Sequence, residues 1–317
     1  MSRHNLIRFA LAAITLLPLP ARAAGLDGFV KVPYQVIDNR YVVRCILNGK
    51  PLNMLIDCGA AVSVIDKSVF DSAVPKAEQV VPKGVPGKIA ANDVSLPIGM
   101  TKNLQAGGMS FGNRPVAIYD FSRANEFARR FGSYTPNPHI VVDGLIGFDI
   151  LRSHNAIIDT THQVVHFDPS RSKRGGRLSE NMRRFGFTRV QMTLDRHGNL
   201  LVPCTVNSKT GQLVVDTGAH ISQLNYRFAS AAGVSLRPSS TVTHGIPIKM
   251  GLGVGNSGST EIFIAEPQLF KVGEYQYPRG PIGCLQHQFA TDGFLGPDML
   301  EKGHAFLDFG NNCLFLK

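Results

Sequence analysis

Residues 41–60 read YVVRCILNGKPLNMLIDCGA, and residues 200–219 read LLVPCTVNSKTGQLVVDTGA. The second stretch aligns with the first without a gap at an offset of 159 positions, since 216 − 57 = 159. Identical residues in and just after the two stretches are Val43/Val202, Cys45/Cys204, Asn48/Asn207, Lys50/Lys209, Asp57/Asp216, Gly59/Gly218, Ala60/Ala219 and Ser63/Ser222. Self-similarity at one fixed offset indicates an internal duplication of the chain.

A second pair of blocks supports the duplication. Residues 143–151 read DGLIGFDIL and residues 292–300 read DGFLGPDML, at an offset of 292 − 143 = 149. The blocks come in the same order in each half. Each half therefore predicts a hairpin, an apolar strand that ends in Asp-x-Gly, a short helix and a final pair of strands. We predict an all-β fold of two equal lobes, residues 24–169 and residues 184–317.

The composition agrees with a turn-rich β protein. The chain has 317 residues, of which 44% are hydrophobic and 18% are charged. This is enough apolar surface for one large core or two smaller ones, and it argues against disorder. The 32 glycines and 19 prolines, spread among many short apolar runs, favour strands over a helical bundle.

The N-terminus has the features of a secretory signal. Arg3 and Arg8 precede the apolar run Phe9–Leu19, and Ala21-Arg22-Ala23 fits the small-x-small cleavage rule. We expect residues 1–23 to be a signal peptide, the mature chain to start near Ala24, and the protein to be periplasmic or secreted. The apolar run is shorter than the roughly 20 residues that span a bilayer, so we predict no membrane span.

Positive charge gathers between the two lobes. The formal net charge is +10, and a basic run holds Lys173, Arg174, Arg177, Arg183 and Arg184. Such a run could contact nucleic acid or an anionic surface. It also contains Gly175, Gly176 and Ser179, which favours a solvated linker. We predict a linker over residues 170–183 and no nucleic-acid partner.

The five cysteines are Cys45, Cys58, Cys204, Cys284 and Cys313. In an oxidising compartment they could form disulfides, but an odd count leaves at least one thiol unpaired. Their spacing does not reveal a pairing, and no Cys-x-x-Cys indicates a metal or redox site.

Asp57 and Asp216 carry the chemical argument. One Asp-x-Gly after an apolar strand is most simply a turn in which the side chain bonds to its own backbone. Two copies in a duplicated chain have a second explanation besides the simple turn, because a pseudo-two-fold axis would bring the two equivalent loops together. Two carboxyl groups held close together cannot both ionise, because their negative charges repel each other. One of them therefore keeps a proton, and the pair can serve as acid and base.

The two loops Asp57-Cys58-Gly59-Ala60 and Asp216-Thr217-Gly218-Ala219 resemble the active-site loops of clan AA aspartic peptidases, the retropepsin and pepsin-like group. The segments Leu145-Ile146-Gly147 and Phe294-Leu295-Gly296 resemble the hydrophobic-hydrophobic-Gly motif of the same group. The short lobes and the block DGLIGFDIL are similar to bacterial exported retropepsin-like proteins.

The resemblance implies a bilobal acid-protease fold made of two retropepsin-like closed β-barrel repeats. It implies a monomer that cleaves peptide or unfolded protein, with no metal and no cofactor. Asp57 and Asp216 would hold a water between them. The ionised carboxylate would take a proton from that water as it attacks the peptide carbonyl, and the protonated one would donate to the carbonyl oxygen.

The first loop departs from the family pattern. The family has Thr or Ser after the aspartate, and its hydroxyl bonds across to the opposite loop, whereas Cys58 is a poor donor and acceptor. We expect bracing from one side only, through Thr217. The alternative is a catalytically inactive, peptide-binding relative in the periplasm.

Other features are weaker. Substrate-covering flaps are expected between the two blocks of each half, with Gly84–Gly87 and Gly251–Gly255 as candidate tips. His220 and His244 are expected to be surface residues. Gly108–Gly112 matches the elbow of serine hydrolases, but that elbow needs a strand before it and a helix after it. The sequence contains neither a nucleotide-binding fingerprint nor His-Glu-x-x-His.

Overall fold

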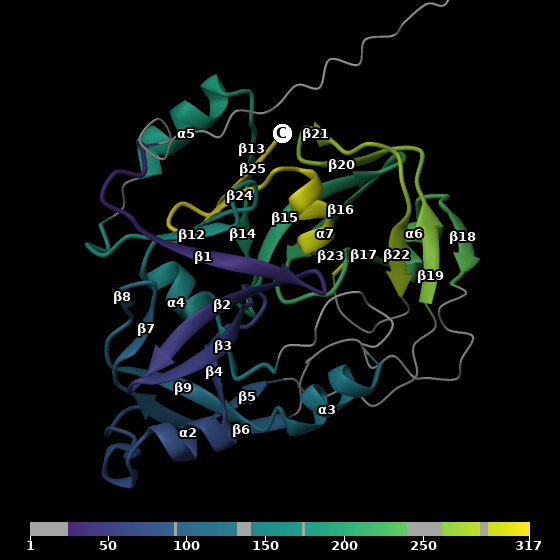
Figure 1. Cartoon of the computed structure of the whole chain (residues 1–317). Coiled ribbons are helices and arrows are strands. Elements are labelled where there is room, and N and C mark those ends of the chain that lie inside the picture. Colours follow the sequence, from purple (N-terminus) through teal and green to yellow (C-terminus); the bar gives the residue numbers. More distant parts are fainter. Residues whose placement is uncertain (1–24, 92–93, 132–140, 173–174, 240–261, 286–290) are drawn as a thin grey trace, which may run out of the picture.

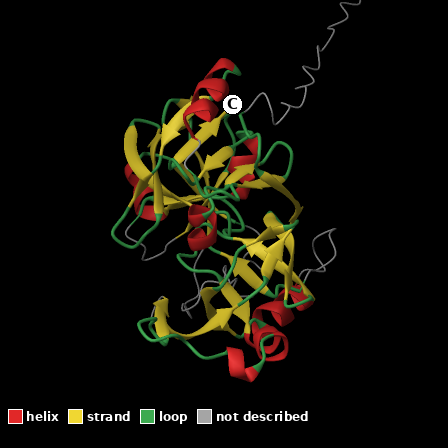
Figure 2. Ribbon diagram, turned by 90° about the vertical axis from the view of Figure 1, so that its left-hand side faces the viewer, coloured by secondary structure: helices red, strands yellow, loops and turns green. Residues whose placement is uncertain are grey.

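The computed structural model describes residues 25–91, 94–131, 141–172, 175–239, 262–285 and 291–317 (Figure 1). Most of the described elements are strands, gathered in an upper and a lower group (Figure 2). The predicted all-β character of the chain is confirmed. The predicted signal peptide lies outside the described residues, and the predicted lobe boundaries stay predictions.

The first half of the chain forms the first lobe. Its strands are β1 (Val30–Ile37), β2 (Arg40–Leu47), β3 (Lys50–Ile56), β4 (Val64–Asp66), β5 (Lys88–Ala91), β6 (Val94–Thr101), β7 (Leu104–Ala106), β8 (Met109–Ser110), β9 (Arg114–Tyr119), β10 (Gly144–Ile146), β11 (Ile157–Asp159) and β12 (Val164–Phe167). Its helices are α2 (Lys67–Ala73), the 3-10 turn η1 (Lys76–Glu78), α3 (Ser122–Phe131) and α4 (Phe148–Ser153).

The second half forms the second lobe. Its strands are β13 (Thr188–Gln191), β14 (Thr193–Leu194), β15 (Leu200–Val206), β16 (Lys209–Val215), β17 (Gln223–Asn225), β18 (Ser235–Pro238), β19 (Ile262–Glu266), β20 (Phe270–Val272), β21 (Tyr275–Gln276), β22 (Ile282–Leu285), β23 (Gly293–Leu295), β24 (Phe306–Asp308) and β25 (Cys313–Leu316). Its helices are α6 (Tyr226–Ala231) and α7 (Pro297–Lys302), and α5 (Gly175–Arg184) precedes β13.

The repeated blocks occupy the centre of each lobe. In the first lobe β10 runs parallel to β3 and antiparallel to β4. In the second lobe β23 runs parallel to β16 and antiparallel to β17. The conserved order of apolar strand, turn and apolar pair thus produces the same three-stranded arrangement twice, with the Asp-x-Gly turn at the end of β3 and of β16.

One sheet joins the two lobes. It is the part of a 15-stranded sheet with the strand order β13-β25-β24-β11-β12-β1, three strands from each half, and beyond β1 the sheet continues into β2. At its centre Ile158 of β11 pairs with Leu307 of β24. These two residues are counterparts in the duplication, since 307 − 158 = 149. The joining strands therefore pair one copy of the duplicated block directly with the other.

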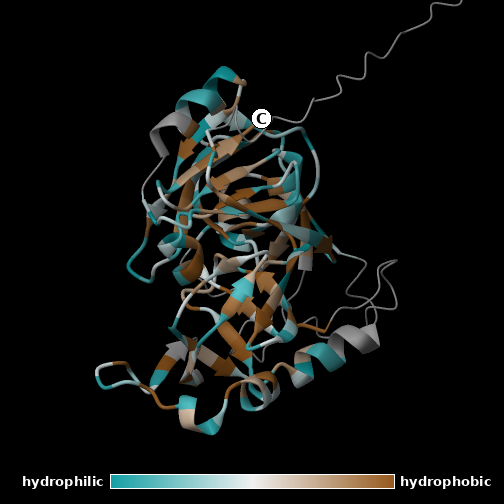
Figure 3. Ribbon diagram, turned by 60° about the vertical axis from the view of Figure 1, so that its left-hand side comes forward, coloured by the Kyte–Doolittle hydropathy of each residue, from teal (hydrophilic) through white to brown (hydrophobic). Residues whose placement is uncertain are grey.

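Alternation along the strands builds the cores. In β2 the side chains of Tyr41, Val43, Cys45 and Leu47 are buried, and in β15 those of Leu200, Val202, Cys204 and Val206 are buried. Successive side chains of a strand point to opposite faces, so each set lies on one face against a core. In Figure 3 the strands are mostly brown, while α3 and α5 are largely teal.

The segment predicted as a linker, residues 170–183, contains most of α5. Leu178 and Met182, four residues apart, are buried in a cluster with Phe187, Phe306 and Phe315. Residues four apart share one helix face, so this part of the segment is packed against the joining sheet rather than solvated. No helix within the described ranges is long and apolar enough to cross a membrane.

Candidate active site

Asp57 and Asp216 occupy equivalent positions at the ends of β3 and β16. The backbone N–H of Asp57 donates to the carbonyl oxygen of Ile146 at 2.9 Å, and that of Asp216 donates to Leu295 at 3.0 Å. Each aspartate is therefore the first residue after its strand and is still held by the last residue of the apolar pair in its own lobe.

Each carboxylate closes its own turn. Asp57 Oδ1 accepts hydrogen bonds from the N–H groups of Gly59 and Ala60, both at 3.0 Å. Asp216 Oδ1 accepts from Gly218 at 2.8 Å and from Ala219 at 3.2 Å. The turn geometry expected for a single Asp-x-Gly is thus present, but one oxygen of each carboxylate does not take part in it.

The two loops face each other. A Cβ atom placed on Gly59 would lie 2.6 Å from Oδ1 of Asp216, and one placed on Gly218 would lie even closer to the carboxyl group of Asp57. Each glycine of one loop therefore lies against the carboxylate of the other, and only a residue without Cβ fits. The structure brings Asp57 and Asp216 together, as the duplication predicts.

The surroundings of the pair favour one shared proton. Burial raises the pKa of Asp57, and the negative charge of Asp216 raises it further. Burial also raises the pKa of Asp216, against the lowering effect of the N–H groups of Gly218 and Ala219 and of a hydrogen bond with Asp57. The two groups titrate as one coupled system, so the raised pKa values and the retained proton belong to the pair.

Thr217 braces the opposite loop as predicted. Its buried hydroxyl accepts from the N–H of Cys58 at 3.0 Å and donates to the carbonyl oxygen of Ile56 at 2.8 Å. The hydroxyl of the second loop thus bonds to the first loop on both sides of Asp57.

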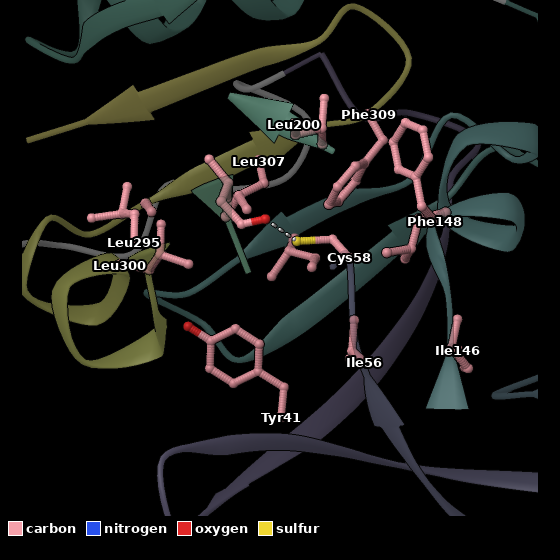
Figure 4. Close-up of a cluster of buried hydrophobic side chains, with 14 of the residues drawn as sticks. Tyr41, Ile56, Cys58, Ile146, Phe148, Leu200, Leu295, Leu300, Leu307 and Phe309 are labelled. Carbon is pink, nitrogen blue, oxygen red and sulfur yellow. Dashed lines mark hydrogen bonds between the residues drawn. The ribbon is translucent and has the colours of Figure 1, made fainter. Parts of the chain in front are cut away.

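The expectation of one-sided bracing is wrong, because Cys58 makes the reciprocal contacts. Its Sγ donates to the carbonyl oxygen of Val215 at 3.2 Å, drawn as a dashed line in Figure 4, and accepts from the N–H of Thr217 at 3.4 Å. Burial raises the pKa of the Cys58 thiol to about 12, so the thiol keeps the proton it donates. Sulfur forms weak hydrogen bonds, but the thiol of Cys58 still lies where it can bond to the opposite loop.

The hydrophobic-hydrophobic-Gly motifs position the aspartates. Ile146 and Leu295, both buried, supply the carbonyl groups that hold them, and Leu145 and Phe294 precede these residues in β10 and β23. Gly147 is needed because a Cβ atom there would meet the backbone of Val62 at 2.6 Å.

Gly296 has the equivalent constraint. A Cβ atom there would meet the backbone of Ile221 and Ser222 at 2.9 Å. The predicted motif residues therefore act through their backbones: the apolar pair bonds to the aspartate, and the glycine allows the next loop to pack closely.

The sequence did not predict two serine–aspartate pairs that hydrogen-bond to the glycines of these motifs. The hydroxyl of Ser222 donates to Asp298 Oδ1 at 2.7 Å and accepts from the N–H of Gly296 at 2.8 Å. The hydroxyl of Ser63 donates to Asp149 Oδ1 at 2.7 Å and accepts from the N–H of Gly147 at 3.0 Å. Both serines and both aspartates recur in the duplication, so the signal was in the repeated blocks.

The remaining candidates are the two expected flap tips, two histidines and the segment Gly108–Gly112. Gly84–Gly87 precede the β5–β6 hairpin, and the residues between those two strands lie outside the described ranges, as do Gly251–Gly255 and His244. His220 is exposed, as expected. Ser110 ends β8, and the next described element is strand β9, so the elbow of a serine hydrolase is not formed.

All five cysteines lie in the described part of the chain, and each is buried with a free thiol. Disulfides, which the sequence left open, are therefore not formed. No group of three or more His, Cys, Asp or Glu side chains within the described ranges is placed to hold a metal ion.

Comparison with known proteins gives a match in the first lobe. Residues 43–150 match the model of a family described as aspartyl protease, and this range contains Asp57 and the segment 145–147. Among solved structures, the retroviral protease-like domain of Ddi1 from Leishmania major is 25% identical, with 38% of this chain and 88% of that chain covered and a TM-score of 0.27. At this TM-score the likeness adds nothing to the fold already described. A search of curated proteins found no match.

Proposed function

We propose that this chain is an aspartic endopeptidase in which Asp57 and Asp216 activate one water molecule for attack on a peptide bond. The observation that supports this most is the mutual approach of the two loops, in which each glycine lies against the carboxylate of the opposite loop. The aspartyl protease match of residues 43–150 supports the reaction class.

The chemistry follows from the shared proton. The ionised member of the pair takes a proton from the water as its oxygen attacks the carbonyl carbon, and the protonated member donates to the carbonyl oxygen. The result is a tetrahedral diol. As the diol collapses, the carboxyl group that took the water proton gives it to the nitrogen of the leaving amine, the C–N bond breaks, and a hydroxyl of the diol gives its proton to the other carboxylate. The pair therefore again holds one proton.

Cys58 bears on whether the site is active. The alternative of an inactive peptide-binding protein rested on weak bracing of the first loop. In the structure Cys58 bonds to Val215 and Thr217, so the aspartate-bearing loops are braced from both sides. We therefore favour an active enzyme that acts on peptides or unfolded proteins as a monomer.

We also propose that the mature protein is exported to the periplasm or secreted, and that it belongs among bacterial exported retropepsin-like proteins. The features that support export are the basic start, the apolar run Phe9–Leu19 and Ala21-Arg22-Ala23. N-terminal sequencing of protein from the native host should give a start near Ala24, whereas an intact Met1 in cytoplasmic protein would refute export.

The test of the proposed activity is cleavage of denatured protein with and without an inhibitor that mimics the tetrahedral intermediate. Cleavage that the inhibitor abolishes supports the peptidase, because such compounds bind the transition-state geometry. Peptide binding without cleavage, unchanged when Asp57 is replaced by Asn, would support the inactive peptide-binding alternative instead.

A further inference from the structure

Arg114, the first residue of β9, is a mostly buried cation close to the first aspartate loop. Its side chain is 12% exposed, and Nη1 lies 3.5 Å from Oδ2 of Asp149. Nε donates to the carbonyl oxygen of Phe111 at 3.2 Å, and Nη2 donates to the hydroxyl of Ser153 at 3.3 Å. A guanidinium presents its donors in a fixed planar fork, so these three contacts hold it in one orientation.

The contacts of Arg114 tie β9 to helix α4. Asp149 lies in the first turn of this helix and Ser153 is its last residue, so the guanidinium contacts both ends of α4. The first residue of the helix, Phe148, donates its N–H to the carbonyl oxygen of Ala60 at 2.8 Å. Ala60 belongs to the first aspartate loop, and a shift of α4 would therefore shift this loop.

A second path runs through hydrogen bonds to Asp57 itself. Asp149 Oδ1 accepts from the hydroxyl of Ser63, and this hydroxyl accepts from the N–H of Gly147. Ile146, the residue before Gly147, holds the N–H of Asp57 through its carbonyl oxygen. A series of contacts thus leads from the guanidinium to the backbone of the first aspartate.

The positive charge of Arg114 favours one direction for these hydrogen bonds. Burial raises the pKa of Asp149, while the hydrogen bond from Ser63 and the charge of Arg114 oppose this rise. The cation therefore favours the ionised carboxylate. An ionised carboxylate only accepts hydrogen bonds, so the hydroxyl of Ser63 has to donate to it and uses its oxygen to accept from Gly147.

The second lobe supplies an internal comparison. Strand β4 pairs in parallel with β9, and its counterpart β17 pairs in parallel with β22. In this register Ala117 corresponds to Gly283, so Arg114 and Gly280, each three positions earlier, are counterparts. A Cβ atom on Gly280 would meet nothing within 4 Å. The second lobe therefore has open space where the first has a guanidinium.

The link from α4 is also specific to the first lobe. The counterpart of Phe148 is Pro297, since 297 − 148 = 149, and proline has no N–H to donate. The first loop is the one that contains Cys58, whose sulfur bonds more weakly than the hydroxyl of Thr217. The additional contacts thus support the loop whose own bracing is the weaker.

We propose that Arg114 is a positioning residue for Asp57, which acts through Asp149, Ser63 and helix α4. It holds the first aspartate loop from β9, and glycine at its counterpart position gives the second loop no such hold. The positioning is a property of the fold, whereas its effect on the reaction rests on the proposed peptidase function.

Hydrogen exchange of single backbone amides, measured by NMR on the complete chain, tests the positioning without a substrate. Arg114→Gln should speed the exchange of the N–H groups of Gly147 and Asp57 by about tenfold, because the loop then opens locally more often. The N–H groups of Gly296 and Asp216 are the internal control and should change by less than about twofold. Equal acceleration in both lobes, or no acceleration, would overturn the proposal.

Loss of a buried cation can prevent folding, so a milder pair of variants provides the same test. Arg114→Lys keeps the charge but lacks the fork, and Asp149→Asn removes the opposite charge but keeps an oxygen that accepts from Ser63. Each should speed the exchange of the Gly147 N–H, and the double variant should speed it by clearly less than the product, because both act through one contact. A strictly multiplicative effect would overturn the proposal.

Turnover gives the functional readout. In an active chain Arg114→Gln should lower kcat by about tenfold and change KM by less than about twofold, because the position of Asp57 affects the chemical step more than binding. Arg114→Lys should recover part of the loss. The control Arg44→Gln removes an exposed charge from β2 of the same lobe and should change neither constant.

An unchanged kcat in Arg114→Gln would overturn the role in the reaction. A parent chain that cleaves no peptide would instead refute the proposed function, and the exchange of the Gly147 and Asp57 amides would then decide the positioning alone.

Discussion

At the scale of single residues, Cys58 decides how the aspartate loops are held. The sequence predicted Asp57, Asp216 and Thr217 in their observed places, because the duplication fixes equivalent positions. It did not predict the two contacts of Cys58, because donor strength was judged without the geometry that brings Sγ to Val215 and to Thr217. The position of the group matters here more than its intrinsic strength.

Replacement of Cys58 should show whether the position or the strength of its hydrogen bonds matters. Cys58→Thr restores an oxygen and should leave peptidase activity intact or raise it, whereas Cys58→Ala removes both sulfur contacts and should destabilise the fold by about 1–2 kcal/mol. Cys45→Ala is the control, since Cys45 is a buried thiol in the same lobe whose Sγ is not part of the bracing. A large loss of activity in Cys58→Thr would show that the thiol has another role.

The raised pKa values of the pair predict the pH dependence of activity. In acid both carboxyl groups are protonated and no base remains, and in alkali both are ionised and no acid remains. The profile of kcat should therefore be bell-shaped. Its alkaline limb should lie above the range of about 4 that is ordinary for carboxyl groups, since burial raises both values. An alkaline limb within that ordinary range would contradict the burial effect.

The same shifts predict the pH dependence of stability. The pKa of Asp57 is higher in the folded state than in the unfolded state, so its contribution to stability is fully present in acid and is lost as the pH rises through the folded-state value. Asp57→Asn cannot ionise. It should unfold at a higher temperature than the parent in alkaline buffer and at nearly the same temperature in acid, with the exposed Asp71→Asn as control. An equal difference at both pH values would contradict this.

At the scale of elements, the repeated blocks predicted the central strands of both lobes and their turns. They could not predict α5, because the glycines and charges of this segment are typical of linkers and only the four-residue spacing of Leu178 and Met182 indicates a packed helix face. They also missed the supports Ser63/Asp149 and Ser222/Asp298, which were visible as repeated residues whose partners only the fold brings together.

Removal of the Ser222 hydroxyl should destabilise the loop that positions Asp216. Ser222→Ala leaves the N–H of Gly296 and the carboxylate of Asp298 without this partner, which should cost about 1–2 kcal/mol of stability and lower kcat more than it changes KM. Ser230→Ala, exposed in α6 of the same lobe, is the matched control. Unchanged stability and unchanged kcat in Ser222→Ala would exclude the support role.

At the scale of the whole molecule, the joining sheet makes one site out of two lobes. The sequence predicted two similar lobes but not the pairing of β11 with β24, because strand pairing between repeats leaves no periodic signal. Ile158 pairs with its own counterpart Leu307 in this sheet, and the two aspartate loops lie against each other. This arrangement places Asp57 and Asp216 where the proposed function requires them to share one proton.

The most direct test of this unit is the peptidase activity of Asp57→Asn, Asp216→Asn and the double variant, measured on chains confirmed to be monomeric. A pair that shares one proton works only when both members are present. Each single replacement should therefore remove nearly all activity, and the double variant should be hardly worse than either. Substantial activity in Asp57→Asn, with none in Asp216→Asn, would contradict the account, because the first loop would then not take part in the reaction.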